Sequence, residues 1–273
     1  MKRTFQILFF SLMAGALSSC DTSKTDDNDP WGKIDPGKVE AQSVAMDRSM
    51  HSNAMGRDMT YSVWLPNGYD EKETYPFLYL LHGYEDGNQN ATWNRCWLEK
   101  GNAAYLADQY QKSGGVAMVI IMPNGLDKFY IWDNYETYFE EELMAKVEAD
   151  FHCNGKRAIA GLSMGGFGTL WHATKFPTKF TYAYAMSPAA SMYGMDPKNN
   201  INTASDKSVF PKFTIEVGKS DMTVNNSDSK KLYDHMVKNG ITCDWIERDG
   251  THDWAFWKGC LPKTLQKVGA SFK

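Results

Sequence analysis

Apolar runs without polar alternation do most to constrain the fold of this chain. Residues 75–83 (YPFLYLLHG) and 115–125 (GVAMVIIMPNG) are of this kind, which is typical of strands buried on both faces of a sheet. Segments with helical spacing follow, among them YFEEELMAKVEADF at 138–151. Because a strand buried on both faces needs helices on both sides, the alternation predicts an α/β fold. We expect a mostly parallel central sheet with helices on both faces.

The remaining elements are expected to continue this alternation. Segments 39–46 and 59–66 predict an antiparallel pair of strands, joined by a turn near residues 53–57. Further strands are expected at 156–163, 180–187, 213–218 and 241–250, and further helices at 92–114, 165–177, 227–240 and 254–272, with Pro262 a candidate break in the last. We find no internal repeats, so a single domain over residues 38–273 is the economical interpretation.

The first 20 residues have the pattern of an export signal. Lys2 and Arg3 precede an apolar stretch at 5–17 that is too short to span a membrane comfortably. The stretch ends in LSSC, and this run before Cys20 resembles the lipobox of bacterial lipoproteins. Residues 1–20 are therefore expected to be a lipoprotein signal peptide, with Cys20 as the lipidated residue. An ordinary signal peptide with a chance cysteine is the alternative.

Residues 21–37 have the composition of a flexible acidic tether. They are rich in Asp, Ser, Thr, Pro and Gly and poor in apolar residues. The acidic cluster Asp26, Asp27 and Asp29 resembles signals that carry some lipoproteins to the outer cell surface, and a plain solvated linker explains it equally well. We expect an exported protein that is lipid-anchored to the bacterial outer membrane. The net charge of −4, without a long basic run, argues against nucleic acid as a partner.

Four cysteines remain after Cys20, and none lies in a C-x-x-C pair that would indicate zinc or redox chemistry. Buried free thiols are the default interpretation. An exported chain can form disulfides, but the sequence does not determine a pairing among Cys96, Cys153, Cys243 and Cys260.

The stretch IAGLSMGG at residues 159–166 carries the clearest chemical signal. Gly161, Ser163 and Gly165 fit the G-x-S-x-G pattern of a nucleophile elbow, in which a strand turns sharply into a helix and presents a serine. An expected strand precedes the serine and an expected helix follows it, as the motif requires. A glycine-rich turn with an incidental serine is the alternative if the rest of a catalytic site is missing.

A serine hydroxyl is a poor nucleophile at neutral pH, so a histidine must take its proton and a carboxylate must hold that histidine. In α/β-hydrolases both follow the serine in the chain, the acid first. His252 lies just after the last expected strand, whereas His172 and His235 lie on helices. Asp221 falls directly after the strand at 213–218, where such sheets collect catalytic groups, and is the preferred acid. Asp249 and Asp253 are the runners-up because they are close to His252 in sequence.

An acyl-transfer site also needs two hydrogen-bond donors for the developing oxyanion. One is normally the backbone N–H of the residue after the nucleophile, here Met164. The other comes from a loop after an early strand. The sequence LLHGYEDG supplies such a loop, and it predicts the backbone N–H of Tyr84 as the second donor, with Gly83 allowing a close approach.

Four stretches in combination resemble the esterase D and carbohydrate esterase family 1 branch of the α/β-hydrolases. They are YPFLYLLHGYEDG, GLSMGG, GKSD and GTHDWAFWKGCL, and the segment from Gly56 to Gly83 also matches the opening of this branch. The branch includes feruloyl and acetylxylan esterases, S-formylglutathione hydrolases and mycolyltransferases. The resemblance covers about residues 38 to 270. It implies the triad Ser163, Asp221 and His252, the oxyanion donors Tyr84 and Met164, and neither a metal nor a cofactor.

Aromatic residues make up 14% of the chain, and some fall beside the expected site. Tyr130 and Trp132 in FYIWDNY, and Trp254 in HDWAFWK, are expected to border it and to bind substrate, since aromatic walls suit a feruloyl ring or a sugar. Trp257 is explained equally well by packing of the last helix.

We therefore expect a secreted serine esterase that removes feruloyl or acetyl groups from plant polysaccharides such as xylan. The lipobox argues against an S-formylglutathione hydrolase, which belongs in the cytosol. A general short-chain carboxylesterase or an acyltransferase of the same family is one alternative. A non-catalytic glycan-binding lipoprotein is another, although it would have no need to retain all three triad residues.

Overall fold

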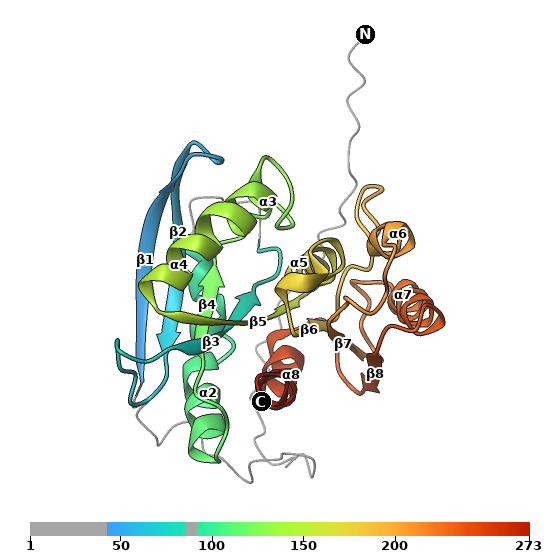
Figure 1. Ribbon diagram of the computed structural model, residues 1–273. Coiled ribbons are helices and arrows are strands. Elements are labelled where there is room, and N and C mark those ends of the chain that lie inside the picture. The colour runs from blue at the N-terminus through green and yellow to red at the C-terminus, as the bar shows by residue number, and fades with distance from the viewer. Residues whose placement is uncertain (1–42, 86–91) are drawn as a thin grey trace, which may run out of the picture. The chain divides into compact units, whose positions relative to one another are not determined.

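The computed structural model describes residues 43–85 and 92–273, and these residues form an eight-stranded sheet (Figure 1). The spatial order of the strands is β1-β2-β4-β3-β5-β6-β7-β8. Their bounds are β1 Val44–Ser52, β2 Arg57–Leu65, β3 Tyr75–Leu81, β4 Val119–Pro123, β5 Cys153–Leu162, β6 Tyr182–Met186, β7 Lys212–Gly218 and β8 Cys243–Arg248. The expected export signal with Cys20 and the tether at 21–37 lie outside the described residues.

The sheet is antiparallel at one end and parallel elsewhere. β1 pairs with β2 and β2 with β4 in antiparallel fashion, and every other neighbouring pair is parallel. The central strands β3, β4 and β6 are buried along their whole length, as their continuous apolar sequences predict. The edge strand β1 is largely exposed. The predicted α/β class with a mostly parallel sheet is confirmed.

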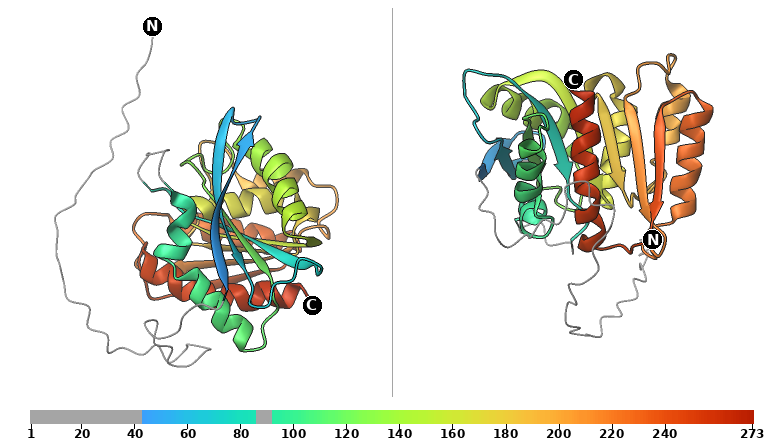
Figure 2. Two further views of the ribbon diagram at one scale, coloured as in Figure 1. Left: turned by 90° about the vertical axis from the view of Figure 1, so that its left-hand side faces the viewer. Right: turned by 90° about the horizontal axis from the view of Figure 1, so that it is seen from below.

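Helices cover both faces of the sheet (Figures 1 and 2). α2 (Ala103–Lys112) and α8 (Trp254–Ser271) pack together on one face. On the other face lies α5 (Met164–Lys175), followed by α6 (Pro197–Thr203) and α7 (Asn226–Lys238), each packed against the one before. Between β4 and β5, on the α5 side, the chain forms α3 (Tyr135–Thr137), a π-helical turn η2 (Tyr138–Leu143) and α4 (Met144–Asp150). The short elements η1 (Trp93–Arg95), α1 (Cys96–Glu99) and η3 (Pro177–Lys179) complete the set for the described part of the chain.

Three element predictions need correction. The expected helix 92–114 is interrupted at Gly101 and Asn102, because Asn102 has a left-handed backbone with a φ of 53°. α8 continues through Pro262 instead of breaking there. The short helix α6 falls between the strands expected at 180–187 and 213–218, where no helix was predicted. Pro197 occupies its first turn, and the Asp196 side chain caps it by accepting from the Lys198 N–H.

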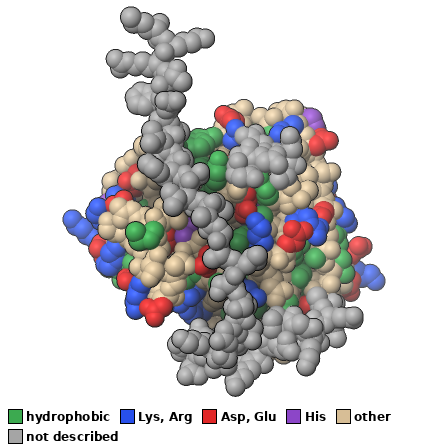
Figure 3. Space-filling model, turned by 180° about the vertical axis from the view of Figure 1, so that it is seen from behind, with side chains coloured by type: hydrophobic (Ala, Val, Ile, Leu, Met, Phe, Trp, Pro, Cys, Tyr) green, Lys and Arg blue, Asp and Glu red, His purple; other side chains and the backbone are tan. Residues whose placement is uncertain are grey.

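The surface and the thiols are unremarkable for a globular domain. Positive and negative side chains are intermingled on the face shown in Figure 3, consistent with the small net charge. Within the described ranges, no helix combines the length and the apolar composition needed to cross a membrane.

Cys96, Cys153, Cys243 and Cys260 are all free thiols. Cys96 and Cys260 are buried, whereas the other two are partly exposed.

A buried charged group fixes α5 to the π-helical turn. The Glu140 carboxylate accepts hydrogen bonds from His172 Nδ1 at 2.6 Å and from Lys179 Nζ at 2.6 Å, and the His172 and Glu140 side chains are almost completely buried. His172 Nε2 lies 3.0 Å from the Tyr130 carbonyl. Burial raises the pKa of Glu140. The hydrogen bonds and charges of His172 and Lys179 lower the pKa by more than burial raises it, so the net pKa lies below its usual value.

We predict that Glu140→Gln destabilises the protein in a pH-dependent way. A carboxyl group with a lowered pKa stabilises the fold above its unfolded pKa, and this contribution is lost as the pH falls through the lowered value. The variant should lose about 3 kcal/mol at pH 7, or about 6–12 °C in Tm, and the difference from wild type should shrink below about pH 4. Thermal unfolding followed by circular dichroism at pH 7 and pH 3.5 measures this, with the exposed Glu71→Gln as control. An equal loss at both pH values would contradict the prediction.

Candidate active site

The parallel strands place the predicted catalytic residues at one edge of the sheet. Ser163 follows β5, Asp221 lies three residues after β7, and His252 lies four residues after β8. The loop His82–Gly83–Tyr84 follows β3, the neighbour of β5. Because all four strands run in the same direction, their carboxyl ends meet at the edge where α/β sheets usually bind ligands.

Ser163 occupies a strained turn between β5 and α5. Its φ of 51° and ψ of −114° are unusual for a residue with a side chain. The turn is held by hydrogen bonds from Ser163 N–H to the Met186 carbonyl at 2.9 Å and from Phe167 N–H to the Ser163 carbonyl at 3.0 Å. The turn is possible only with glycines on both sides, since a Cβ on Gly161 would lie 2.4 Å from the Gly165 oxygen. This is the geometry of a nucleophile elbow.

The loops that carry Asp221 and His252 are joined by their backbones. Lys219 N–H donates to the Arg248 carbonyl at 2.9 Å, and Ser220 N–H donates to the Gly250 carbonyl at 3.0 Å. Gly218 allows this approach, because a Cβ there would lie 2.5 Å from the Gly250 oxygen. The two loops therefore form one unit, and the spacing of the acid and the histidine is fixed by main-chain hydrogen bonds.

The three side chains form a continuous hydrogen-bonded chain. His252 Nδ1 lies 2.7 Å from Asp221 Oδ2, and His252 Nε2 lies 2.8 Å from Ser163 Oγ. A carboxylate can only accept, so Nδ1 carries the proton and Nε2 has a free lone pair for the serine hydroxyl. The Asp221 side chain is fully buried, and that of His252 is 11% exposed. The structure thus brings together the three residues that the sequence singled out, in the arrangement that activates a serine.

The surroundings of Asp221 keep it ionised. Burial raises the pKa of its carboxyl group, but the hydrogen bond and charge of His252 lower it more, helped by two backbone donors. These are the N–H groups of Val224 and Thr223, at 3.2 and 2.9 Å from Oδ1. One carboxylate oxygen is therefore held by the backbone, and the other is left to orient the imidazole.

The other acids and histidines are engaged elsewhere. Asp253 caps α8 by accepting from the Phe256 N–H at 2.9 Å, and Asp249 is exposed and paired with Lys219. His172 belongs to the buried Glu140 group, and His235 lies on α7. Neither alternative acid therefore hydrogen-bonds to His252, and neither alternative histidine hydrogen-bonds to Ser163.

The two residues predicted to supply the oxyanion donors, Met164 and Tyr84, lie in segments that adjoin Ser163. Met164 is the first residue of α5, and N–H groups in the first turn of a helix have no partner within the helix. Gly83, which precedes Tyr84, passes so close that an added Cβ would lie 3.4 Å from Ser163 Cβ and 2.6 Å from the Leu162 side chain. The chain before Tyr84 thus passes close to Ser163, while Tyr84 itself is 56% exposed.

The prediction that Tyr130 binds substrate is wrong, because its side chain is completely buried. Its hydroxyl donates to the His82 carbonyl at 3.1 Å, and its own carbonyl lies against His172. The His82 imidazole is also buried: Nε2 accepts from the Gly125 N–H at 2.7 Å, and Nδ1 lies 2.6 Å from the Gly83 carbonyl. Tyr130 and the His82 imidazole therefore hold the backbone of the loop His82–Gly83–Tyr84 in place through hydrogen bonds.

The other two rings that were expected to border the site, Trp132 and Trp254, are partly exposed. Trp132 is half-buried, with its ring 4.9 Å from that of Phe129 and 5.2 Å from that of Tyr193. Trp254 is half-buried against Trp97 and Trp257. The Trp257 ring meets the His252 imidazole edge to face at 4.9 Å and is itself buried, so it packs against the catalytic histidine. Phe129 and Tyr193 were not predicted to border the site, and the signal that could have found Phe129 is its position in FYIWDNY beside Tyr130.

One cluster has the residue types of a metal site but is already engaged. Within the described ranges, the ligand atoms of His82, Glu85 and Cys96 lie within 4.8 Å of one another. The Gly125 N–H occupies the lone pair of His82 Nε2, which leaves Nδ1 protonated, and Lys100 pairs with Glu85 at 2.7 Å. Burial, with the nearby Glu85, raises the pKa of the Cys96 thiol to about 12. These residues do not offer an ion the free donors that it needs.

Comparisons with known proteins identify the family of the chain. The chain matches the family described as "Putative esterase" over residues 52–268, and it belongs to that family. It is 26% identical over 235 residues to the endo-1,4-beta-xylanase/feruloyl esterase of Xylanibacter ruminicola, covering 80% of this chain and 30% of the relative. It is also 26% identical over 237 residues to the acetyl esterase of Caldicellulosiruptor saccharolyticus, covering 72% of this chain and 84% of the relative. The chain thus spans less than a third of the first relative.

Solved structures show the same fold. A ferulic acid esterase superposes with a TM-score of 0.76 at 26% identity, covering 86% of this chain and 100% of the other. The ferulic acid esterase of the anaerobic fungus Anaeromyces mucronatus superposes with a TM-score of 0.71 at 20% identity, covering 90% and 97%. The fold is therefore that of the α/β-hydrolase esterases, and family membership places the chain among the carboxylic ester hydrolases.

We predict that Gly165→Ala disrupts the elbow. A Cβ on Gly165 would lie 2.5 Å from the backbone oxygens of both Leu81 and His82, and backbone cannot move aside as a flexible side chain can. We expect a loss of about 1–3 kcal/mol in the free energy of unfolding, together with loss of esterase activity. Gly259→Ala, on the exposed side of α8, is the matched control, since its Cβ meets only the end of the Arg248 side chain at 3.2 Å. Urea denaturation of both variants tests this, and equal stability would contradict it.

Proposed function

We propose that this protein is a serine esterase that hydrolyses acyl esters on plant polysaccharides through an acyl-enzyme. The observation that carries the proposal is the hydrogen-bonded chain from Asp221 through His252 to Ser163 at an elbow beside two backbone donors. Membership of the esterase family supports the reaction class. Relatives described as feruloyl and acetyl esterases support acyl groups of this kind on a carbohydrate.

Each residue has a definite part in this mechanism. Ser163 Oγ attacks the ester carbonyl while His252 Nε2 takes its proton. The oxyanion that forms is stabilised by the backbone N–H groups of Met164 and Tyr84. His252 then gives the proton to the leaving alcohol, which departs and leaves an acyl group on Ser163. A water molecule repeats the sequence through the same histidine and releases the acid, and Asp221 stabilises the imidazolium in both halves.

We also propose where the protein acts. The basic start, the apolar stretch and the lipobox at residues 1–20 support export and lipid attachment at Cys20, and residues 21–37 have the composition of a tether. A lipid-anchored esterase at the outer membrane would meet large polysaccharides that do not enter the cell. Residues 38–273 then form the single catalytic domain.

Ser163→Ala tests the reaction class. We expect the variant to fold like wild type and to lose turnover by about 10⁶-fold, because no other group can form the acyl-enzyme. Initial rates on methyl ferulate and 4-nitrophenyl acetate, with fluorophosphonate labelling as a second readout, measure this. Ser208→Ala, an exposed serine outside the site, is the control.

The pattern of rates distinguishes the acyl groups. Serine-dependent turnover of methyl ferulate supports a feruloyl esterase, and turnover of the acetate alone supports a deacetylase or a short-chain esterase. A folded protein that hydrolyses neither substrate and is not labelled by the fluorophosphonate would contradict the proposal.

Asp221→Asn tests the orientation of the histidine. An amide can donate to Nδ1, which favours the tautomer with the proton on Nε2 and removes the base from Ser163. We expect kcat to fall by about 10⁴-fold with little change in KM, because the loss is in the transition state. Steady-state kinetics on methyl ferulate or 4-nitrophenyl acetate measure both parameters. Asp249→Asn should retain wild-type rates, and a comparable loss in that variant would show that the wrong acid has been assigned.

A further inference from the structure

A run of four aromatic rings leads away from the catalytic serine, and we call it the aromatic strip. Its members are Tyr84, Phe129, Trp132 and Tyr193, and successive ring centroids lie 6.5, 4.9 and 5.2 Å apart. Phe129 and Trp132 are half-buried, whereas Tyr84 and Tyr193 are 56% and 72% exposed. Rings with this much exposure form an open surface, not the lining of a closed pocket.

The strip begins at the nucleophile. Tyr84 directly follows Gly83, which lies against Ser163. The Phe129 ring also packs on that of Phe167 at 6.1 Å, and the Phe167 N–H is the donor that holds the Ser163 carbonyl. The strip is therefore connected to the Ser163 turn at two points, through Gly83 and through Phe167.

The far end of the strip is a tight turn built to present a ring. Met192 and Met195 exchange backbone hydrogen bonds of 3.0 and 2.8 Å, and the two residues between them have positive φ angles. Gly194 accepts such a conformation at no cost, whereas Tyr193, with a φ of 47°, does so against its preference. Its ring nevertheless stands in solvent and contacts only Trp132 among the described rings.

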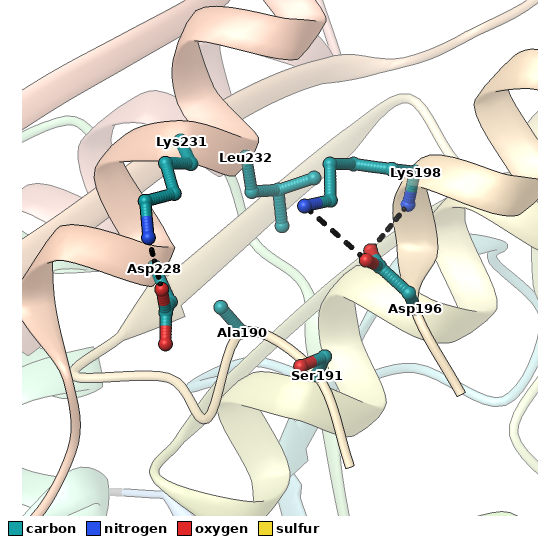
Figure 4. A pocket seen from close by; sticks show the side chains of 7 residues that line it. All are labelled: Ala190, Ser191, Asp196, Lys198, Asp228, Lys231 and Leu232. Carbon is teal, nitrogen blue, oxygen red and sulfur yellow. Dashed lines mark hydrogen bonds and ion pairs between the residues drawn. The ribbon is translucent and has the colours of Figure 1, made fainter. Parts of the chain in front are cut away.

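Residues on either side of this turn, Ser191 and Asp196, line a polar hollow of about 200 Å³ (Figure 4). Ser191 offers a hydroxyl there, and two ion pairs, Lys198 with Asp196 at 3.2 Å and Lys231 with Asp228 at 2.8 Å, face it from α6 and α7. Such paired donors and acceptors suit the hydroxyl groups of a sugar. The neighbouring strip suits the apolar C–H faces of sugar rings, which stack on the electron-rich faces of aromatic rings.

We propose that the aromatic strip binds the sugar chain of an acylated polysaccharide and positions its ester at Ser163, an inference that rests on the proposed esterase function. A feruloyl group is a single flat ring and would use one or two of the four side chains. A chain of sugars presents one ring after another, and so it can occupy the whole length. The open, solvent-facing geometry also lets a long polymer enter and leave without threading.

Binding in the absence of turnover tests the inference. In the purified Ser163→Ala protein, the affinities for unesterified xylohexaose and for ferulic acid are measured by isothermal titration calorimetry. Adding Tyr193→Ala should weaken xylohexaose binding about three- to tenfold. Tyr193→Phe, which keeps the ring, should retain most of the affinity. Val237→Ala, an exposed apolar residue on α7, controls for truncation elsewhere.

The outcomes separate the sugar from the acyl group. Xylohexaose binding that is absent, or that is unchanged by Tyr193→Ala, overturns the inference. A loss of ferulic acid affinity with sugar binding intact also overturns it and assigns the strip to the acyl group. Because no hydrolysis is needed, a protein that binds sugar through Tyr193 but lacks Ser163-dependent turnover contradicts only the proposed function.

Discussion

The close packing of α5 against the end of β3 is the constraint on which the active site depends. Gly165 lies so near the Leu81 and His82 carbonyls that any side chain would displace backbone. This contact fixes the start of α5, and with it the Ser163 turn and the Met164 N–H. It also fixes the chain at Gly83 and Tyr84, because they directly follow His82. One backbone contact thus positions Ser163 and the residues predicted to supply the oxyanion donors relative to each other, which is the kind of preorganisation that acyl transfer requires.

The histidine is positioned by a different interaction, a buried charge beneath its loop. Glu216 on β7 is fully buried and accepts from Arg248 at 2.5 Å, from Lys263 at 3.3 Å and from the Tyr184 hydroxyl. Arg248 also donates to the Phe256 carbonyl at 2.6 Å and lies over the Phe256 ring. Arg248 ends β8 and Phe256 lies in the first turn of α8, so this group spans the loop that contains His252. Removing one partner of such a buried group usually costs several kcal/mol, and here the loss would also free the catalytic loop.

Much of this could be predicted from the sequence, because the informative signals are local. Apolar runs located the strands, and the serine elbow carries its own glycines. Asp221 and His252 could be chosen because each lies just after the end of an expected strand. Tyr130 could not be placed in this way, since its neighbours Phe129 and Trp132 are partly exposed while it points into the core. Tyr193 gave no signal because only the folded turn at Met192 to Met195 brings it beside Trp132.

The loop between β4 and α3 explains why the prediction that Tyr130 binds substrate was wrong, and it also explains how Phe129 and Trp132 come to lie in the aromatic strip. Six of its non-glycine residues have positive φ angles: Leu126, Asp127, Phe129, Tyr130, Asp133 and Asn134. Asp and Asn tolerate this conformation, but for Leu126, Phe129 and Tyr130 it costs about 1 kcal/mol or more each, so the surroundings must hold the loop on this path. Tyr130 is the main anchor, held by His82 at its hydroxyl and by His172 at its carbonyl. An ordinary extended loop would alternate its side chains between core and solvent. This strained path instead buries Tyr130 and leaves the rings of Phe129 and Trp132 partly exposed in the aromatic strip. Backbone strain of this kind gathers at functional sites, which agrees with the role that we propose for the aromatic strip.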